Sequence, residues 1–545
     1  MITLNKIFSS FKYIKINLIL ASILFTVFNG FDYFYSLIDL RYKFFPDKNY
    51  LFGVYLLFFI SSFCKSTVGL FFFLSYIIFS SFLQYVHIGY FGTLIEPNEY
   101  FLFFNQLHEI TNSIQDWGRV IFYPFLVLIF CVFIKFTIYK KLNEKRQKSS
   151  ILTVIFLLVL VYGPYKIIAF NDSFGRRADA NASTFYNSYS TLSYFLVNLL
   201  PRIIFDQQLI GEIKPSPSPI RNSSEPVIFV IGESLSFRHM SLFGYYKKTT
   251  PFLDALHKNQ KIIARKAISC GVSTDVAIPM LVHQSCGIDV IPQIISGNSC
   301  LMKLANKNGY EVSFFTSQSG QELKGIYNYL CPSSIDNYQD GSSQSQDYDS
   351  NANDLKLIPL VKNLDWGQKN KFVVLQMRSA HSPYDENYPS ELEVFKANSE
   401  ETWEEERVRT YDNSVHLIDF FIKELISVLE KKIRGRYHLV FIPDHGQSVG
   451  ENGRFGHLQL VEEQYQIPFF YYSNSEIATP IAKLQSREWY SMKEVSRLVA
   501  YLLGYFEDWE ENPEQIMVLG TDIEGHAGYL KLNFENGVFV ESHRY

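Results

Sequence analysis

Acidic and imidazole side chains follow short apolar runs in the second half of the chain. Glu233 ends the run "PVIFVIGE", and Asp444 and His445 follow the apolar part of "YHLVFIPDHG". Zinc and similar divalent cations are bound by such carboxylate and imidazole groups. In this triplet the strand ends, Gly446 lets the backbone turn, and the two side chains before it can diverge around a cation. An isolated Asp-His-Gly triplet is more often only a capped turn. Together with Glu233, however, the triplet predicts a metal site.

A metal site of this kind can activate a hydroxyl nucleophile. The segment "SCGVSTDVAIPM" offers Ser273 and Thr274 directly before a short helical pattern. The positive end of a helix dipole favours both an ionised hydroxyl and a bound phosphate. A simple helix cap is the ordinary role of a serine–threonine pair. The prediction of a nucleophile therefore depends on the metal site beside it.

Two further histidines could contact a substrate. His381 lies in "SAHSPY", just beyond the apolar run "KFVVLQM", and His457 is returned by the loop "QSVGENGRFGH". Surface turns are the common place for such histidines. Because the carboxyl ends of parallel strands meet along one edge of a sheet, we expect His381 at the same edge as Glu233 and Asp444.

The elements that must position these residues read as an α/β domain with a parallel or mixed sheet. The runs "PVIFVIGE", "YEVSFFTSQ", "KFVVLQMRSAHSP" and "YHLVFIPDHG" are almost continuously apolar before they end in polar residues, as in strands buried on both faces. Helical patterns such as Thr410–Leu429 lie between them. The C-terminal segment "GYLKLNFENGVFVES" predicts a hairpin that turns at residues 535–537.

The first 170 residues are strongly apolar and predict a transmembrane domain of five helices. The stretches are Ile16–Leu37, Tyr50–Phe63, Val68–Val86, Val120–Tyr139 and Ile151–Phe170. Four of them approach the roughly 20 residues that cross a bilayer as a helix, and the second is shorter. With the N-terminus inside, the basic loops share one side of the membrane, which places everything after Phe170 outside.

Two segments connect this domain to the α/β domain. Thr191–Phe205 is apolar but short, and we expect it to form a helix in the membrane surface. A sixth span there would put the large domain in the cytoplasm. Ile213–Pro226 is a Pro/Ser-rich tether. The predicted organisation is a transmembrane domain at 1–170, interfacial helices and linker at 171–222, and the α/β domain at 223–545.

Charge and cysteine content narrow the function classes. The net charge of −4 gives no basic field for nucleic acid. The large domain has an even number of cysteines without a CxxC pair, which argues against a zinc cage and for two disulfides in an oxidising compartment. These cysteines are Cys270, Cys286, Cys300 and Cys331. Their pairing is open, and a cytoplasmic domain would instead hold them as free buried thiols.

Taken in order, the motifs resemble those of the membrane-anchored phosphoethanolamine transferases of Gram-negative bacteria, within the alkaline phosphatase and sulfatase superfamily. The resemblance covers nearly the whole chain. It is carried by "IGESLSFRHMSLFGYYKKTTPFL", "SCGVSTDVAIPM", "AHSPY", "YDNSVHLIDF" and "DHGQSVGENGRFGH". It implies a transmembrane domain of five helices in the cell inner membrane, followed by a periplasmic α/β/α sulfatase-like domain.

The resemblance also implies roles for single residues. Thr274 matches the nucleophilic threonine. The zinc ligands would be Glu233, Thr274, Asp444 and His445, and the substrate contacts would be His381, His457 and Lys324. Gln447 stands where many members have a glutamate, so the number of metals stays open. The cysteine pattern differs from that of the lipid A branch, so the acceptor stays open as well.

The implied reaction transfers phosphoethanolamine from phosphatidylethanolamine to a cell-envelope glycolipid, either lipid A or the core of lipopolysaccharide. It would use Zn²⁺ and a covalent phospho-threonine intermediate. Two alternatives are a phosphoglycerol transferase of the lipoteichoic-acid-synthase kind and a non-catalytic membrane-anchored relative, which Gln447 favours. A sulfatase is disfavoured because no Cys/Ser-x-Pro-x-Arg motif surrounds Thr274.

Overall fold

The computed structural model divides the chain into two compact units. It describes residues 2–39, 48–91, 97–101, 118–142, 146–170, 182–201, 213–320, 322–341, 354–367, 370–510, 515–523 and 527–544, with a few single residues between them. One unit, the helical unit, comprises residues 1–207 and 452–454. The other, the α/β unit, comprises residues 208–451 and 455–545.

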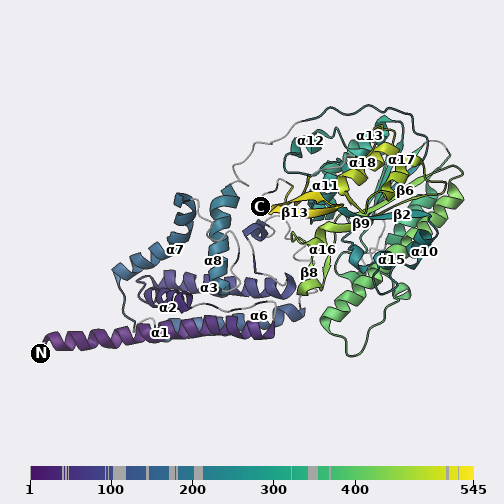
Figure 1. Ribbon diagram of the computed structural model, residues 1–545. Helices are drawn as coiled ribbons and strands as arrows, with labels where there is room; N and C mark the ends of the chain where they lie inside the picture. The colour runs from purple at the N-terminus through teal and green to yellow at the C-terminus, as the bar shows by residue number, and fades with distance from the viewer. Residues whose placement is uncertain are drawn as a thin grey trace. The chain divides into compact units, whose positions relative to one another are not determined.

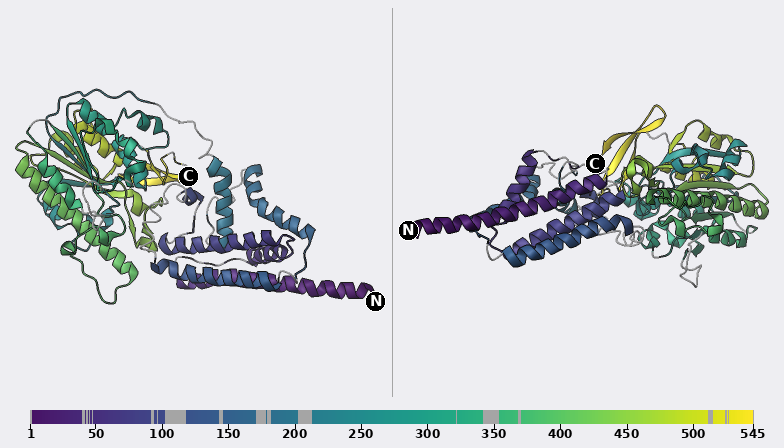
Figure 2. Two further views of the ribbon diagram at one scale, coloured as in Figure 1. Left: turned by 180° about the vertical axis from the view of Figure 1, so that it is seen from behind. Right: turned by 90° about the horizontal axis from the view of Figure 1, so that it is seen from below.

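Helices form at all five apolar stretches of the helical unit (Figure 1). They are α1 (Ile2–Ile38), α2 (Lys48–Ser61), α3 (Thr67–Phe91), α6 (Gly118–Leu142) and α7 (Ser150–Phe170). A shorter helix, α8 (Thr184–Tyr194), follows and continues into a π-helical turn at Phe195–Leu199. In both views of Figure 2, α3 and α6 lie side by side, in agreement with their extensive contact.

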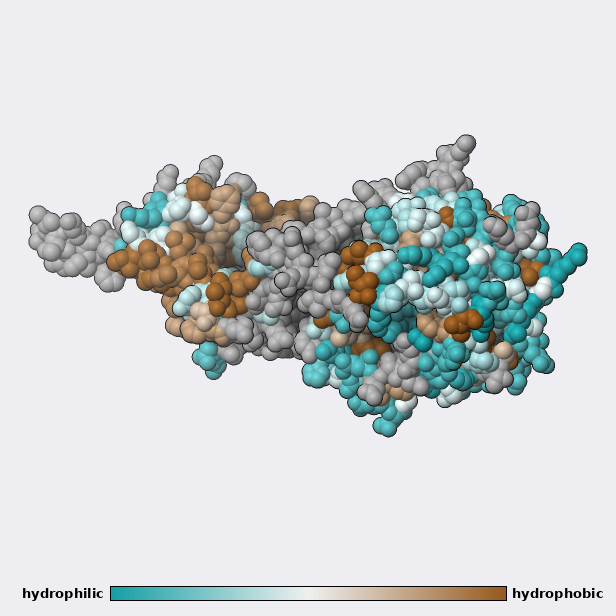
Figure 3. Space-filling view, turned by 90° about the horizontal axis from the view of Figure 1, so that it is seen from above, coloured by the Kyte–Doolittle hydropathy of each residue, from teal (hydrophilic) through white to brown (hydrophobic). Residues whose placement is uncertain are grey.

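Three of these helices are long and apolar enough to cross a membrane: Ile14–Ile38, Thr67–Gly89 and Ser150–Phe170. The apolar parts at Lys48–Ser61 and Ile121–Phe133 are shorter than a full span. Figure 3 shows apolar side chains gathered on the presented face of the helical unit, whereas the α/β unit is mostly hydrophilic. The exposed apolar side chains include Phe34, Phe72, Phe122 and Phe133. A helical region with three candidate spans is therefore present, and the count of five remains a prediction.

The segment expected in the membrane surface begins earlier than the sequence suggests. Its helix starts at Thr184 because the Ser183 side chain accepts a hydrogen bond from the Tyr186 amide and caps it. Several of its polar side chains are buried where α8 packs on α3. Residues 202–205 lie outside the described part of the chain, and the interfacial placement stays a prediction.

The α/β unit is built on an eight-stranded mixed sheet with the order β10-β2-β9-β6-β1-β5-β3-β4. Its strands are β1 (Val227–Gly232), β2 (Ile262–Ile268), β3 (Glu311–Thr316), β4 (Asn337–Gln339), β5 (Lys371–Gln376), β6 (His438–Pro443), β9 (Gln466–Ser473) and β10 (Trp489–Ser491). Only β9 runs against its neighbours. The expected α/β fold is confirmed.

Helices cover both faces of this sheet, as Figure 1 shows. On one face, Val227, Phe229 and Ile231 pack with α11 (Thr274–Val282), α13 (Leu301–Lys307) and α18 (Met492–Leu502). On the other face, Ile228 and Val230 pack with α10 (Pro251–Lys258), α14 (Leu357–Asn363) and α15 (Trp403–Lys432). Successive strand residues point to opposite faces, so a strand buried on both sides must be apolar throughout.

Smaller elements complete the unit. They are α12 (Ile291–Ser296), α16 (Glu462–Tyr465), α17 (Thr479–Ala482), the pair β7 (Ser448–Val449) and β8 (Phe455–Gly456), and the sheet β11 (Gln515–Leu519), β12 (Tyr529–Glu535) and β13 (Val538–Arg544). The predicted C-terminal hairpin is confirmed, and it turns through Asn536 and Gly537 at φ of 51° and 86°. Helix α15 begins before Thr410 because Thr402 and Glu405 form a capping box.

Candidate functional site

Two neighbouring parallel strands bring the predicted acidic residues together. In the register of β1 and β6, Gly232 lies opposite Pro443. The residues that follow, Glu233 and Asp444, therefore leave the sheet side by side. The Asp444 amide also donates a hydrogen bond of 3.1 Å to the Gly232 carbonyl, which extends the strand pairing to the site itself.

Gly446 is required for space rather than for an unusual backbone angle. Its φ is not in the left-handed region. A Cβ at this position would lie 2.3 Å from the carbonyl oxygen of Glu463, far inside van der Waals contact. The Gly446 amide donates a 2.8 Å hydrogen bond to the neighbouring Gln464 carbonyl. The glycine thus allows the chain after His445 to pack closely against the backbone of Glu463 and Gln464.

Thr274 is the first residue of α11, and its hydroxyl lies at the centre of the predicted metal ligands. Its Oγ1 is 2.8 Å from Asp444 Oδ2 and 3.4 Å from both carboxylate oxygens of Glu233. His445 Nε2 is also 3.4 Å away. The three surrounding groups are buried, whereas Thr274 is partly exposed. Among these four residues, Thr274 is therefore the one that can be reached from outside.

The cluster has more lone pairs than protons, which fits a bound cation. The single Thr274 hydroxyl proton can be given to only one of the acceptors around it. His445 Nε2 lies 3.7 Å from Glu233 Oε1 and 3.5 Å from Asp444 Oδ2. Two buried carboxylates are costly without positive charge between them. Carboxylate, imidazole and hydroxyl groups with their ligand atoms within 4.8 Å of one another are suitable donors for zinc.

Hydrogen bonds from outside the cluster fix the orientation of these groups. His445 Nδ1 is 2.8 Å from the Gly446 carbonyl, to which it must donate, so Nε2 carries the lone pair that faces the carboxylates. Asp444 Oδ1 accepts hydrogen bonds from the amides of Ser234 and His445, at 3.0 and 2.7 Å. Its other oxygen, Oδ2, is then the one turned toward Thr274.

Gln318 belongs to the site although the sequence motifs did not single it out. Its Nε2 donates a 2.7 Å hydrogen bond to Glu233 Oε2, and Ser234 Oγ donates a 2.7 Å hydrogen bond to Oε1. Gln318 follows β3 by two residues, at the same sheet edge as Glu233. The rule that placed Glu233 beyond a strand end could have identified it as well.

His457 lies beside the cluster in a fixed orientation. Its ring is 4.7 Å from that of His445, centroid to centroid, and its Nδ1 is 3.0 Å from Gln447 Oε1. Gln447 Nε2 in turn donates a 2.6 Å hydrogen bond to the Tyr384 hydroxyl. Burial, aided by the neighbouring His445, lowers the pKa of His457 to about 3, so its imidazole is neutral.

His381 lies one ring further out. Its imidazole is 5.9 Å from that of His457, and its Nδ1 donates to the Ser382 carbonyl at 2.6 Å. The structure therefore brings both predicted histidines to the edge that carries the acidic cluster. Lys324 lies on a short 3₁₀ helix at Glu322–Gly325, but its side chain is outside the described part of the chain. Its predicted phosphate contact stays a prediction.

Comparisons with known proteins identify similar chains and a similar fold. The family model named Sulfatase matches residues 226–505. Phosphoethanolamine transferase EptA of Helicobacter pylori is 26% identical over 326 residues, which cover 58% of this chain and 60% of that protein. Kdo(2)-lipid A phosphoethanolamine 7''-transferase of Salmonella typhimurium is 22% identical over 382 residues, which cover 65% and 66%. The chain thus spans less than two thirds of the length of these relatives.

One solved structure is similar over both units. The integral membrane protein lipooligosaccharide phosphoethanolamine transferase A (EptA) from Neisseria meningitidis has a TM-score of 0.59 and 17% sequence identity. The similarity covers 89% of this chain and 95% of that chain. At this identity the comparison establishes the fold: an α/β unit of this type joined to an N-terminal helical region.

Proposed function

Because this chain belongs to the sulfatase family, we propose that it transfers phosphoethanolamine from phosphatidylethanolamine to a cell-envelope glycolipid, either the lipid A or the core of lipopolysaccharide. The observation that carries the proposal is the position of Thr274 Oγ1, 2.8–3.4 Å from Asp444, Glu233 and His445. The relatives named phosphoethanolamine transferases support the transferred group. The apolar helices support a membrane enzyme whose donor is a lipid.

Glu233, Thr274, Asp444 and His445 would hold a zinc ion. When bound, this ion supplies Lewis-acid chemistry: it lowers the pKa of the threonine hydroxyl and neutralises phosphoryl charge. Gln318 and Ser234 keep both oxygens of Glu233 in place through hydrogen bonds of 2.7 Å. The site is thereby preorganised before the donor arrives.

Thr274 carries the covalent step. Its Oγ1 attacks the phosphorus of phosphatidylethanolamine, the phosphorus–oxygen bond to the glycerol breaks, and diacylglycerol leaves with a proton. Phosphoethanolamine remains esterified to Thr274. A hydroxyl of the acceptor then attacks the same phosphorus, and the threonine oxygen is released and protonated. The helix N-terminus at Thr274 stabilises the phosphoryl charge in both steps.

The histidines handle the protons of the leaving and entering oxygens. Both His381 and His457 use Nδ1 in a hydrogen bond to an oxygen acceptor, which leaves the lone pair on Nε2. A neutral imidazole in this tautomer can accept a hydrogen bond from the acceptor hydroxyl. Because the pKa of His457 is low, His381 is the one that takes the proton of that hydroxyl and returns it to the oxygen that departs. In the proposed orientation the α/β unit lies in the periplasm, and the apolar helices anchor it in the inner membrane.

The test is a vesicle assay with the full-length protein. Vesicles contain phosphatidylethanolamine and a lipopolysaccharide acceptor, and the readouts are diacylglycerol release and the mass of the acceptor. Thr274→Ala should abolish both products. Ser273→Ala is the matched control, because the neighbouring Ser273 Oγ makes no hydrogen bond within the described chain.

Two outcomes would contradict the proposal. Consumption of phosphatidylglycerol instead of phosphatidylethanolamine would identify a phosphoglycerol transferase of the lipoteichoic-acid-synthase kind. An unchanged lipid composition, together with no stoichiometric zinc in the purified protein, would identify a non-catalytic relative. Mass spectrometry of the peptide that contains Thr274, after rapid quenching without acceptor, should show the phosphoethanolamine ester.

A further inference from the structure

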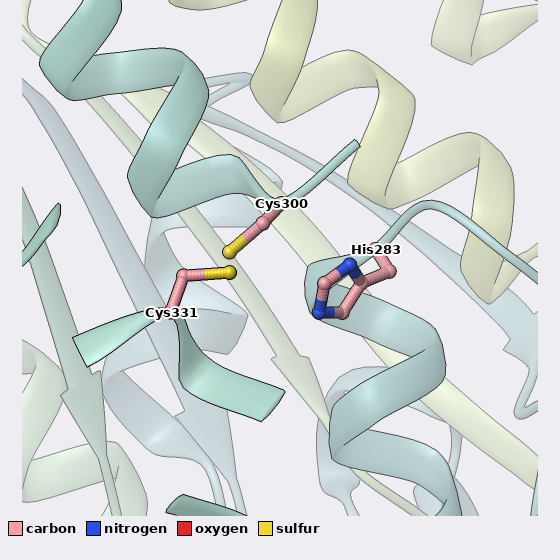
Figure 4. Close-up of side chains that lie close together, drawn as sticks. All are labelled: His283, Cys300 and Cys331. Carbon is pink, nitrogen blue, oxygen red and sulfur yellow. The ribbon is translucent and has the colours of Figure 1, made fainter. Parts of the chain in front are cut away.

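A second group of metal-binding side chains lies at the other end of α11. His283 directly follows the helix, Cys300 precedes α13, and Cys331 joins two short 3₁₀ helices. One imidazole nitrogen and the two sulfur atoms all lie within 4.8 Å of one another. In Figure 4 the two sulfur atoms point toward each other, and the imidazole lies beside them at the end of its helix. Neither cysteine is in a disulfide.

The imidazole of His283 has a buried nitrogen with an unused lone pair. The side chain is fully buried, and its Nε2 is 2.8 Å from the Tyr329 carbonyl. A carbonyl only accepts, so Nε2 carries the proton and Nδ1 carries the lone pair. Within the described chain Nδ1 has no hydrogen-bond partner. A buried polar atom left in this way is destabilising unless something binds it.

We propose that Cys300, Cys331 and His283 Nδ1 bind a zinc ion, with a fourth position left to water or another small ligand. Two thiolates and one imidazole are a donor set typical of zinc. Around a tetrahedral zinc ion these atoms would be about 3.5–3.8 Å apart, given Zn–S and Zn–N bonds of about 2.3 and 2.0 Å. The three ligand atoms already lie within 4.8 Å of one another. On binding, each thiol loses its proton to solvent and forms a sulfur–zinc bond.

The surrounding structure favours an ion at this place. The complex of Zn²⁺ with two thiolates is neutral overall, which suits a site whose Cys300 and His283 are fully buried. Nε2–H of His283 donates to a backbone carbonyl, the usual arrangement for a metal-binding histidine. Cys331 is partly exposed, which gives an ion access.

The local backbone also holds Cys331 in an unusual conformation. Its φ and ψ are 52° and 58°, the left-handed region that a cysteine rarely adopts. Gly297 leaves room beside it, because a Cβ there would lie 3.3 Å from the Cys331 sulfur. Strain of this kind persists where the surroundings over-determine a conformation, often at ligand sites. The Cys331 sulfur is thus directed toward Cys300 and His283 at some energetic cost.

The sequence argument against a zinc cage applied only to closely spaced cysteines. Here the ligands are separated by tens of residues and come from three different elements, so no CxxC pair is needed. A bound ion would connect the C-terminal end of α11, the helix whose first residue is Thr274, to the segments that carry Cys300 and Cys331. The site does not depend on the proposed function, since none of its ligands belongs to the acidic cluster.

The test uses cobalt as a spectroscopic substitute for zinc in the full-length protein. The protein is purified with a reductant, stripped with a chelator and titrated with Co²⁺. A thiolate-to-cobalt charge-transfer absorption in the near ultraviolet is expected. It should persist in Asp444→Asn, because the acidic cluster contains no sulfur, and disappear in Cys300→Ser and Cys331→Ser. The same cysteine variants should contain one equivalent less zinc when isolated.

The proposal is overturned if the wild-type protein shows no such absorption, or if the absorption survives in both cysteine variants. It is also overturned if the protein as isolated contains a Cys300–Cys331 disulfide, which a non-reducing peptide digest would reveal. Failure of the transferase assay with the absorption intact would reject the proposed function alone. Because the wild-type spectrum needs no variant, misfolding of a variant cannot mask the result.

Discussion

Gln447 Oε1 accepts a hydrogen bond from His457 Nδ1 at 3.0 Å. The other end of the same amide donates to the Tyr384 hydroxyl at 2.6 Å. The amide therefore sets the tautomer of His457, with the proton on Nδ1 and the lone pair on Nε2. A glutamate at this position, as in many proteins of the resembled family, would also accept from Nδ1, but it would add a negative charge and could not donate to Tyr384.

Replacement of Gln447 by leucine should reduce transfer without loss of the fold. The variant keeps the volume roughly but frees His457 to rotate and to change its tautomer. Loss of a hydrogen-bond partner that orients a site residue typically lowers activity or metal affinity by about 10–100-fold. We expect kcat to decrease by about this factor and KM to change less. Diacylglycerol release at several donor concentrations measures both.

The control is the same substitution at Gln485, an exposed residue on the 3₁₀ helix at Lys483–Gln485. The variant Gln485→Leu should be as active as the wild type. The variant Gln447→Glu tests the same contact by adding a charge. Its carboxylate should stabilise the protonated imidazole and raise the pKa of His457. The pH profile of kcat should then differ from that of the wild type. Equal rates and pH profiles in the wild type, Gln447→Leu and Gln447→Glu would show that Gln447 does not position His457.

Gln318 should influence metal binding although it is not a ligand. Its amide donates to Glu233 Oε2, and in Gln318→Leu that oxygen loses a fixed partner. We expect zinc affinity at the acidic cluster to fall by about 10–100-fold, the usual effect of losing an outer partner. Competition with a chromophoric chelator measures it. Affinity equal to that of the wild type would mean that Ser234 alone orients Glu233.

The sequence predicted the position of the acidic cluster because that position follows from a general rule. β1 is apolar throughout and β6 is apolar after His438, so they were recognisable as buried strands, and parallel strands end at one edge. Glu233, Asp444 and His445 are the first polar residues after those ends. Thr274 was recognisable from the helical pattern that it opens. These inferences need only the local pattern and the direction of the strands.

Contacts between distant segments were not predictable in the same way. The hydrogen bond between Gln318 and Glu233 joins residues 85 positions apart, and that between Gln447 and Tyr384 joins residues 63 apart. Amides and phenols have no characteristic spacing that reveals such pairs. The cysteines show the same limit. The even count predicted two disulfides, but the fold pairs only Cys270 with Cys286, and the expectation of a second disulfide is wrong because Cys300 and Cys331 are free thiols.

The stability of the α/β unit should fall above neutral pH because of His239. Its Nδ1 lies 2.8 Å from Asp412 and its Nε2 3.5 Å from Glu451, while Lys247 shares the Asp412 carboxylate. Burial by itself lowers the pKa of His239, but the hydrogen bonds and charges of the two acids outweigh it and raise the pKa from 6.5 to about 8. The folded state thus binds this proton more tightly than the unfolded state.

The resulting contribution is fully present below about pH 6.5 and is lost as the pH rises through about 8. It amounts to about 2 kcal/mol. Thermal unfolding of wild type and His239→Gln should therefore differ most at about pH 6 and less at about pH 9. His257→Gln, an exposed histidine on α10, is the control. A difference that does not change with pH would show that His239 acts only through packing.

The disulfide between Cys270 and Cys286 should stabilise the helix that carries Thr274. It closes a segment with a sequence separation of 16, and α11 lies entirely inside that segment. By restricting the unfolded chain, a cross-link of this size contributes about 3 kcal/mol. The double variant Cys270→Ala/Cys286→Ala should melt at a lower temperature and release diacylglycerol more slowly, because the N-terminal end of α11 is then held less firmly.

Chemical reduction supplies the control for the double variant. Treating the wild-type protein with a thiol reductant should lower its melting temperature toward that of the double variant, whereas the double variant itself should not respond through this bond. Alkylation of Cys270 and Cys286 after reduction, followed by peptide mass spectrometry, shows that the intended bond was opened. If reduction opens the bond but melting and activity stay the same, the packing of α11 against the sheet is sufficient to hold Thr274 in place.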